Sequence, residues 1–234
     1  LGVPLEQAEA FLQEANQIDS IEIEGLYSHF ATADEGDLSY ANDQLNKFND
    51  VLAIAEKLEI NPTFIHCSNS GAILNLPESR FNMVRVGMLL YGAFPSDEVP
   101  QDLPIKPVMT FTAPVVEIRD VKAGTPISYG GVYTTEKDTR IAVVQAGFAD
   151  GVPRPWYIDG FVKFKDQNLK ITGRICMDQL MIDVGSADIQ YGDEVLIFGS
   201  NEHGTIDVNE IAKTINSTSY VLVTAIGIRP KRIY

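Results

Sequence analysis

The 234-residue sequence has few of the residues that build metal centres or disulfide frameworks. Its two cysteines, Cys67 and Cys176, and its three histidines show no paired metal-ligand spacing, so we expect no metal site. Positive charge is also scarce, because 18 Lys and Arg stand against 32 Asp and Glu, a formal net charge of −14. A chain of this charge repels phosphate backbones, which argues against nucleic acid as a partner.

Long apolar runs are absent too. No stretch approaches the roughly 18 apolar residues that a membrane helix needs, so no membrane role is expected. No signal-peptide pattern is present, and the cytoplasm is the simplest compartment. There is also no initiator methionine: the chain opens on LGVPLEQAEAFLQEANQ, where Pro4 suits the first position of a helix. An abrupt start at a helix suggests the surviving part of a longer chain.

The first 95 or so residues alternate between helical and strand patterns. Strands are predicted in Ser20–His29, Thr63–Cys67 and Met83–Gly92, and a helix with Leu45, Phe48, Leu52 and Ala55 on one face lies between the first two. This order implies parallel strands joined by helical crossovers. Polar residues gather where the strands end, which is the end that carries the chemistry in a βα-barrel.

From about Lys106 onward the sequence changes to short β-rich runs separated by Gly, Asp or Pro, which is typical of an antiparallel β domain. Its one clear helix is IDVNEIAKTI, with Asp207 as a candidate N-cap. The segment FPSDEVPQDLPIKP holds four prolines and is a plausible linker. We therefore predict an α/β fold with a partial barrel over residues 1–96 and a β domain over residues 105–234.

Four features of the sequence could carry chemistry, and each has a structural alternative. The HCSNSG turn around Asn69 and Ser70 suits a phosphate-bearing ligand at a helix start, or an ordinary N-cap. Arg85, inside an apolar strand, is either in a structural ion pair or holds the polar edge of a ligand. His29, at a strand end, is structural or catalytic. Tyr129, in PISYGGVYTT, either packs on its own domain or is held out to act in another pocket.

Taken together, six stretches resemble the pyridoxal-phosphate-dependent alanine racemases. In chain order they are SHFATAD, HCSNSGA, RVGMLLYG, PISYGGVY, AGFADGVPR and GRICMDQLMIDVG. They follow the family's order and span nearly the whole chain. The resemblance implies the C-terminal part of a (β/α)8 TIM barrel followed by a mainly antiparallel β domain.

The resemblance also implies an isomerase that interconverts L- and D-alanine and supplies D-alanine for peptidoglycan. In this family pyridoxal 5'-phosphate forms an imine (aldimine) with the amino acid and acts as an electron sink, while two bases exchange the Cα proton. Tyr129 matches the base that enters the site of a partner subunit, which implies a homodimer with shared active sites. His29 would link Tyr129 to Arg85, and Arg85 would donate to the pyridine nitrogen. Weakening the electron sink in this way should restrain transamination.

Further positions are assigned by the same resemblance. Asn69 and Ser70 match phosphate contacts, and Gly87 and Met88 match positions whose backbone N–H groups reach the phosphate. Met177 matches a backbone contact to the substrate carboxylate. Two residues match positions near the substrate entrance, namely Phe148 and Asp178.

The sequence departs from the family pattern in three places. No stretch matches the N-terminal motif that carries the cofactor lysine, so we expect the chain alone to be inactive. Phe148 replaces the usual tyrosine at the substrate entrance, and Ile228 stands where many members place a phosphate-contacting tyrosine. Two alternatives therefore stay open: a racemase of another or broader amino-acid set, and a non-catalytic fragment that acts as a binding or oligomerisation module.

Overall fold

The computed structural model describes residues 2–234, which form two compact units. Unit 1 comprises the residues up to Leu90 together with Phe94–Ile105, and unit 2 comprises Tyr91–Ala93 and Lys106–Tyr234. Within these residues no helix is long and apolar enough to cross a membrane. No group of three or more His, Cys, Asp or Glu side chains within them could hold a metal ion.

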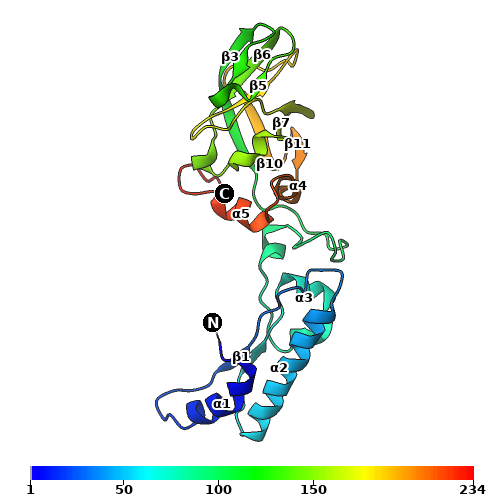
Figure 1. Cartoon of the computed structure of the whole chain (residues 1–234), viewed down its shortest axis with the longest axis vertical. Coiled ribbons are helices and arrows are strands. Elements are labelled where there is room, and N and C mark those ends of the chain that lie inside the picture. The colour runs from blue at the N-terminus through cyan, green and yellow to red at the C-terminus, as the bar shows by residue number, and fades with distance from the viewer. Residues whose placement is uncertain (1) are drawn as a thin grey trace. The chain divides into compact units, whose positions relative to one another are not determined.

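Unit 1 is a short βαβ arrangement with flanking helices (Figure 1). Strands β1 and β2 pair in parallel, and their register places Tyr27 beside His66. The long helix α2 is the crossover between them, which is the connection that parallel strands require. The elements of this part of the chain are η1 (Leu5–Gln7), α1 (Ala8–Asn16), β1 (Gly25–Tyr27), α2 (Ser39–Lys57), β2 (Phe64–His66), α3 (Ser70–Asn75), η2 (Pro77–Arg80) and η3 (Met88–Tyr91).

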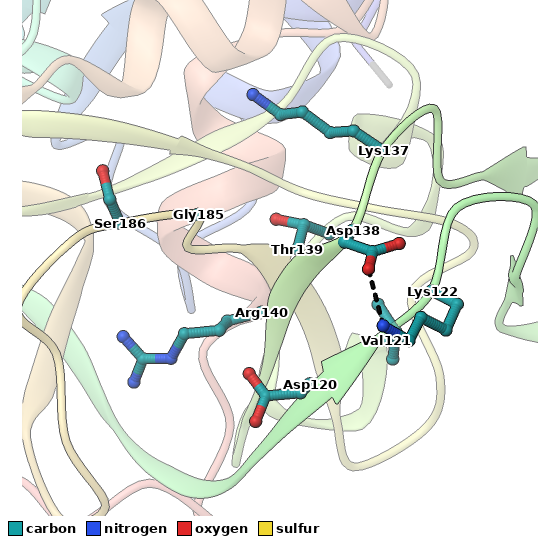
Figure 2. Close-up of a pocket in the computed structure, with 9 residues that line it drawn as sticks. All are labelled: Asp120, Val121, Lys122, Lys137, Asp138, Thr139, Arg140, Gly185 and Ser186. Carbon is teal, nitrogen blue, oxygen red and sulfur yellow. Dashed lines mark hydrogen bonds and ion pairs between the residues drawn. The ribbon is translucent and has the colours of Figure 1, made fainter.

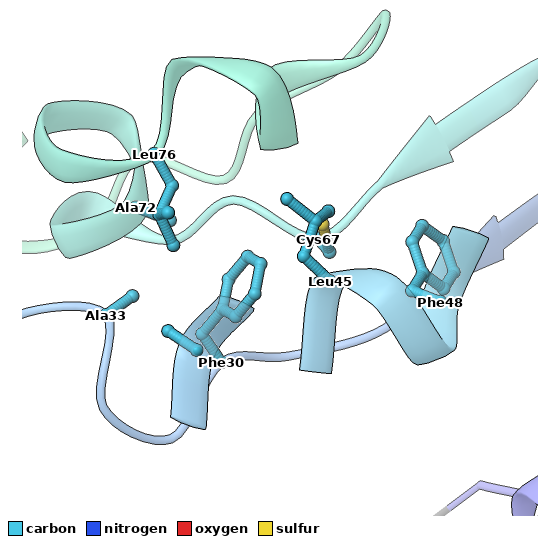
Figure 3. Close-up of a cluster of buried hydrophobic side chains, with 8 residues drawn as sticks. Phe30, Ala33, Leu45, Phe48, Cys67, Ala72 and Leu76 are labelled. Carbon is cyan, nitrogen blue, oxygen red and sulfur yellow. The ribbon is translucent and has the colours of Figure 1, made fainter. Parts of the chain in front are cut away.

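The apolar face of α2 forms the core of unit 1 as its spacing predicts. Leu45 and Phe48 are buried against residues that follow β1 and β2, among them Phe30 and Cys67 (Figure 3). Phe48 also meets the ring of Phe81 edge-on, at 5.6 Å between centroids. A second cluster joins Leu12 of α1 to the C-terminal half of α2. Burial of these side chains is what fixes both helices on the sheet.

The predicted third strand, Met83–Gly92, is wrong. This segment has no regular secondary structure up to Gly87 and then forms η3, because its main chain makes too few hydrogen bonds to β2 for a ladder. Its Arg85 N–H donates to the Ser68 carbonyl (3.0 Å). The Asn82 side chain occupies two main-chain groups in and just before β2. It accepts from the Ile65 N–H (2.8 Å) and donates to the Thr63 carbonyl (2.9 Å). A side-chain amide therefore replaces main-chain pairing.

Unit 2 is built on a seven-stranded sheet in which every pair is antiparallel. The strand order is β8-β7-β10-β3-β6-β9, with β11 paired to β10, and a separate hairpin joins β4 to β5 (Figure 1). The strands are β3 (Phe111–Val121), β4 (Pro126–Ile127), β5 (Tyr133–Thr134), β6 (Thr139–Val144), β7 (Phe161–Phe164), β8 (Gln167–Lys170), β9 (Leu180–Asp183), β10 (Glu194–Asn201) and β11 (Gly204–Ile206). In β3 the alternate residues Phe111, Ala113 and Val115 are buried, whereas in β10 the continuous run from Val195 to Gly199 is buried.

Two helices accompany this sheet, and only one of them is evident in the sequence. Helix α4 (Val208–Thr214) is capped by Asp207, whose carboxylate accepts the Asn209 N–H (2.8 Å). Helix α5 (Ser219–Ala225) is not predicted by the pattern, because five of its seven residues are Ser, Tyr, Val or Thr, which are weak helix formers. Its Leu222 and Val223 are buried, so packing stabilises this helix.

The proline-rich segment before the sheet packs onto unit 1. Val99 is buried, and the Ser96 hydroxyl donates to the Asp34 carbonyl. The Glu98 carboxylate accepts the Gly36 N–H. Four prolines restrict this segment to extended and turn conformations, while the side chains between them hold it in place.

Candidate functional site

Arg85 is the centre of a polar cluster at the carboxyl ends of β1 and β2. Its Nη1 donates to His66 Nδ1 (2.5 Å) and to the His66 carbonyl (3.3 Å). Its Nη2 lies within hydrogen-bond distance of the Ser28 carbonyl (2.8 Å), His29 Nδ1 (3.0 Å) and the Cys67 carbonyl (3.3 Å). All five acceptors are uncharged, so carbonyls and imidazoles, not an ion pair, hold the guanidinium.

One donor of Arg85, its Nε–H, has no partner in this cluster. Among the described residues, no hydrogen bond or ion pair involves its Nε–H, while both Nη groups are engaged. A guanidinium only donates, so each Nδ1 atom that it contacts must accept, which leaves the proton of a neutral imidazole on Nε2. His29 and His66 are therefore both Nε2–H tautomers, and His29, which is exposed, can donate to a further group.

His66 is a member of this cluster that the sequence patterns did not single out. Its ring stacks on Tyr27, with centroids 5.3 Å apart and planes 5° from parallel. Burial, and then the charge of Arg85, lower the pKa of His66. The available signal was its position at the C-terminal end of a strand, where it is the first residue of the HCSNSG stretch.

The HCSNSG turn leads directly into α3. Asn69 is the N-cap, because its Oδ1 accepts the Ala72 N–H (3.0 Å), so the capping interpretation holds for this residue. Ser70 is only 2% exposed, and its Oγ accepts the Gly87 N–H (3.0 Å). That bond brings the RVGM segment, including the buried Met88, beside the start of α3. A backbone N–H and a hydroxyl thus meet at the start of a helix, a combination that suits an anion.

In unit 2, Tyr129 stands on a turn in left-handed backbone. Ser128 has φ +62°, Gly130 +76° and Gly131 +56°, and the side chain of Tyr129 is 66% exposed. Such a φ is strained for serine, and a hydrogen bond from its Oγ to the Arg174 carbonyl (2.6 Å) fixes it. Tyr129 therefore does not pack on its own domain.

The loop with Met177 is joined to the loop with Phe148. The N–H groups of Phe148 and Ala149 donate to the carbonyls of Cys176 and Met177, each at 3.0 Å. A Cβ at Gly147 would collide with both carbonyls, so only glycine lets the loops approach this closely. Phe148 and Met177 are both exposed at this junction.

Arg229 holds the end of the chain against these loops. Its Nη2 contacts Asp178 Oδ1 (2.5 Å) and its Nε contacts Asp150 Oδ1 (3.1 Å). The hydrogen bond with Asp178, and then the charge of Asp150, raise the pKa of Arg229. Ile228 beside it is 95% exposed and offers no hydroxyl.

One cavity of the structure contains none of these residues. It measures about 680 Å³ and lies in unit 2, at the end of β3, the start of β6 and the turn after β9 (Figure 2). Lys122 and Asp138 form an ion pair there (2.7 Å), and the Arg140 guanidinium donates to two main-chain carbonyls, those of Ala187 and Ile189. The hydrogen bond between Lys122 and Asp138 raises the pKa of Lys122 and lowers the pKa of Asp138.

Two family profiles cover the chain. One described as "Alanine racemase, N-terminal domain" matches residues 1–95, and one described as "Alanine racemase, C-terminal domain" matches residues 108–234. The chain belongs to the alanine racemase family. Its fold is accordingly α/β, with part of a (β/α)8 barrel followed by a mainly antiparallel β domain. Alanine racemases are isomerases.

Individual alanine racemases show the same likeness. "Alanine racemase 2" of Caldanaerobacter subterraneus subsp. tengcongensis is 40% identical over 228 residues, which are 97% of this chain and 59% of that protein. The alanine racemase structure from D-cycloserine-producing Streptomyces lavendulae has a TM-score of 0.92 at 37% identity, covering 97% of this chain and 61% of that one. The Bartonella henselae structure, described "with covalently bound pyridoxal phosphate", has a TM-score of 0.87 at 29% identity, covering 100% and 63%. The chain thus spans about three fifths of the length of these relatives.

Proposed function

We propose that the full-length protein interconverts L- and D-alanine with pyridoxal 5'-phosphate and so supplies D-alanine for peptidoglycan. The observation that carries this proposal is the Arg85 cluster, in which neutral acceptors occupy both Nη groups and leave Nε–H as a donor. An uncharged acceptor such as a pyridine nitrogen suits this single donor. When bound, pyridoxal phosphate supplies a conjugated ring that takes up the negative charge left at Cα.

The residues of unit 1 fit the phosphate end of this coenzyme. The buried Ser70 hydroxyl and the Gly87 N–H already meet at the start of α3, and Met88 follows directly. We propose that residues 1–96 hold the phosphate there through Ser70 and the backbone N–H groups of Gly87 and Met88. Asn69 acts by capping the helix that presents them. The exposed Ile228 adds no hydroxyl to this site.

Residues 105–234 supply the groups that act on the amino acid. Tyr129 takes a proton from Cα or returns it on one face, because its exposed phenol stands on a fixed turn. A phenol serves as a base near neutrality only beside a positive or hydrogen-bond-donating group. His29 provides that group through its Nε2–H, held by Arg85. Met177 binds the substrate carboxylate through its backbone, and Phe148 and Asp178 border the entrance.

The exposed phenol also supports a homodimer in which Tyr129 acts in the site of a partner subunit. Purified full-length Arg85→Ala and Tyr129→Phe proteins, each inactive alone, test this arrangement when mixed under subunit exchange. A shared site leaves one intact pair of Arg85 and Tyr129 in each hybrid, so activity should return. If exchange is confirmed by differently tagged chains and no activity returns, each site draws both residues from one chain.

The experiment that tests the function is chiral chromatography of alanine incubated with the full-length protein and pyridoxal phosphate. Racemisation from either enantiomer is the expected result, and bound coenzyme without racemisation would contradict the proposal. Phe148, exposed and lacking a hydroxyl, favours a second candidate, a racemase of broader amino-acid range. The same assay on serine and larger amino acids separates the two.

We place this activity in the cytoplasm. Both cysteines are free thiols, Cys67 buried and Cys176 partly exposed. Free thiols of this kind persist in a reducing compartment. A fluorescent fusion of the full-length protein tests the location, and a purely periplasmic or surface signal would contradict it.

A further inference from the structure

The function proposed above uses Arg85 but not the imidazole that lies nearest to it. We propose that His66, stacked on Tyr27, is a positioning residue that fixes the plane of the Arg85 guanidinium and so aims its remaining Nε–H at the ligand. This inference rests on the proposed function, because the ligand acceptor is the pyridine nitrogen of the coenzyme. His66 itself touches neither substrate nor coenzyme in this role.

The backbone places these three side chains together. Tyr27 and His66 are direct neighbours in the parallel register of β1 and β2. Their rings stack within 5° of parallel, and the Cζ of Arg85 lies 5.7 Å from the centroid of the Tyr27 ring. Tyr27 is thus a platform for both the imidazole and the guanidinium. Contacts of a guanidinium with an aromatic face stabilise its orientation as well as its charge.

His66 then fixes one side of the guanidinium. Nη1 has two acceptors, and both belong to His66: the ring Nδ1 at 2.5 Å and the carbonyl at 3.3 Å. The acceptors of Nη2 come from Ser28, His29 and Cys67. Two sets of acceptors on opposite nitrogens define the guanidinium plane, and the direction of Nε–H follows from that plane because the group is rigid. Loss of His66 leaves Nη1 with no ring acceptor.

The chemistry of His66 fits a permanent acceptor. Its Nδ1 can accept only while the ring is neutral. Burial and the adjacent positive charge both lower the pKa of His66, which keeps the ring neutral under ordinary conditions. Besides Arg85, the titratable groups near His66 among the described residues are Tyr27 on β1, the adjacent Cys67 and, through the guanidinium, His29.

Two substitutions separate the acceptor from the ring. His66→Phe keeps an aromatic ring to stack on Tyr27 and removes the acceptor. His66→Asn keeps an acceptor near the place of Nδ1 and removes most of the stacking surface. His203→Phe is the matched control, because His203 lies in unit 2, where it contacts Phe164 and accepts the Lys165 N–H. Thermal unfolding of each full-length variant checks that it is folded.

The diagnostic measurement in the loaded enzyme is transamination per racemisation event. In that side reaction alanine gives its amino group to the coenzyme, so one pyruvate and one pyridoxamine phosphate appear together. Displacement of the Arg85 donor should raise this ratio on the order of 10-fold in His66→Phe, the loss expected for one charge-assisted hydrogen bond. His66→Asn should restore most of the wild-type ratio, and His203→Phe should leave it unchanged. An unchanged ratio in a folded His66→Phe protein would overturn the inference.

A second readout does not depend on the coenzyme. In histidine-labelled full-length protein, the ¹⁵N shifts of His66 should report an unprotonated Nδ1, and Arg85→Leu should change them. Unchanged shifts in Arg85→Leu would overturn the inference even if His66→Phe does not fold. A wild-type protein that binds pyridoxal phosphate but never racemises alanine would defeat the proposed function instead, and the ¹⁵N result would then judge His66 by itself.

Discussion

The two units solve the problem of backbone hydrogen bonding differently. Unit 2 closes its main-chain bonds in a seven-stranded antiparallel sheet, with β3 eleven residues long. Unit 1 has two strands of three residues and relies on side chains such as Asn82 and Arg85 to bond the adjoining main chain. Unit 2 also carries the strained turn at Ser128, which a side-chain bond to the Arg174 carbonyl fixes, whereas unit 1 presents a dense cluster of polar groups around Arg85. The exposed phenol of Tyr129 and the polar cluster around Arg85 therefore belong to different units.

The largest effect should come from the single phenol of unit 2. Tyr129→Phe in the full-length protein should lower kcat for alanine racemisation by about 10² to 10⁴, the range for loss of one general acid–base group. Stability should not change, because the side chain is 66% exposed. Stopped chiral assays and a melting curve measure both. Tyr191→Phe, at 76% exposure, is the control, and equal losses in the two variants would refute the special role of Tyr129.

Each unit has its own core, so one large-to-small substitution in each core tests whether the two units unfold independently. Phe48→Ala should destabilise unit 1 by about 3–5 kcal/mol, and Leu196→Ala should destabilise unit 2 by about 2–5 kcal/mol, because each leaves a cavity in a buried cluster. Hydrogen exchange resolved by peptide should show each loss confined to its own unit. Exchange that rises equally in both units for either variant would show that they unfold as one.

One cysteine lies in each unit, so the labelling rates of Cys67 and Cys176 report separately on units 1 and 2. Burial raises the pKa of Cys67 to about 11. At pH 8 only on the order of one Cys67 thiol in a thousand is then a thiolate, and the thiolate is the form that reacts. Iodoacetamide should therefore modify the partly exposed Cys176 well before Cys67, as mass spectrometry of peptides can show. Fast labelling of Cys67 would mean that unit 1 opens readily.

The smallest effect is a pH dependence that belongs to unit 1. His66 has a lowered pKa when folded, so the unfolded chain binds more protons than the folded one between that pKa and about 6.5. Its contribution to stability is complete above about pH 6.5 and is lost as the pH falls through this window. Urea unfolding of unit 1 from pH 7.5 to 5 should show the decline, and His66→Asn should flatten it. An identical slope in the variant would assign the decline to other groups.

The sequence predicts those elements in which the spacing of apolar residues matches the face that is buried in the structure. Helix α2 and the cap at Asp207 follow from spacing and side-chain chemistry, as do the locations of β1 and β2. Helix α5 escapes prediction because tertiary packing overrides its weak propensity. The apolar run from Met83 predicts a strand that the structure does not form. The run itself does not reveal that the Asn82 amide will occupy the main-chain groups of Ile65 and Thr63.

For the site, the motifs bring Arg85 and His29 to one place, and the structure adds the contacts between them. His66 could not be recognised from a single sequence. Its function depends on the register that sets it beside Tyr27, and on a guanidinium 19 residues further along the chain. Its place at a strand end, as the first residue of HCSNSG, marks the position but does not reveal these contacts.

The bond from Ser128 to the Arg174 carbonyl has a practical consequence for protein engineering. It links the turn that carries Tyr129 to the loop that continues into Met177. A change in either segment therefore affects the other. A library that varies residues 174–178 to accept bulkier amino acids will also tilt Tyr129. Selection for new specificity should therefore randomise both segments together and hold Ser128 constant.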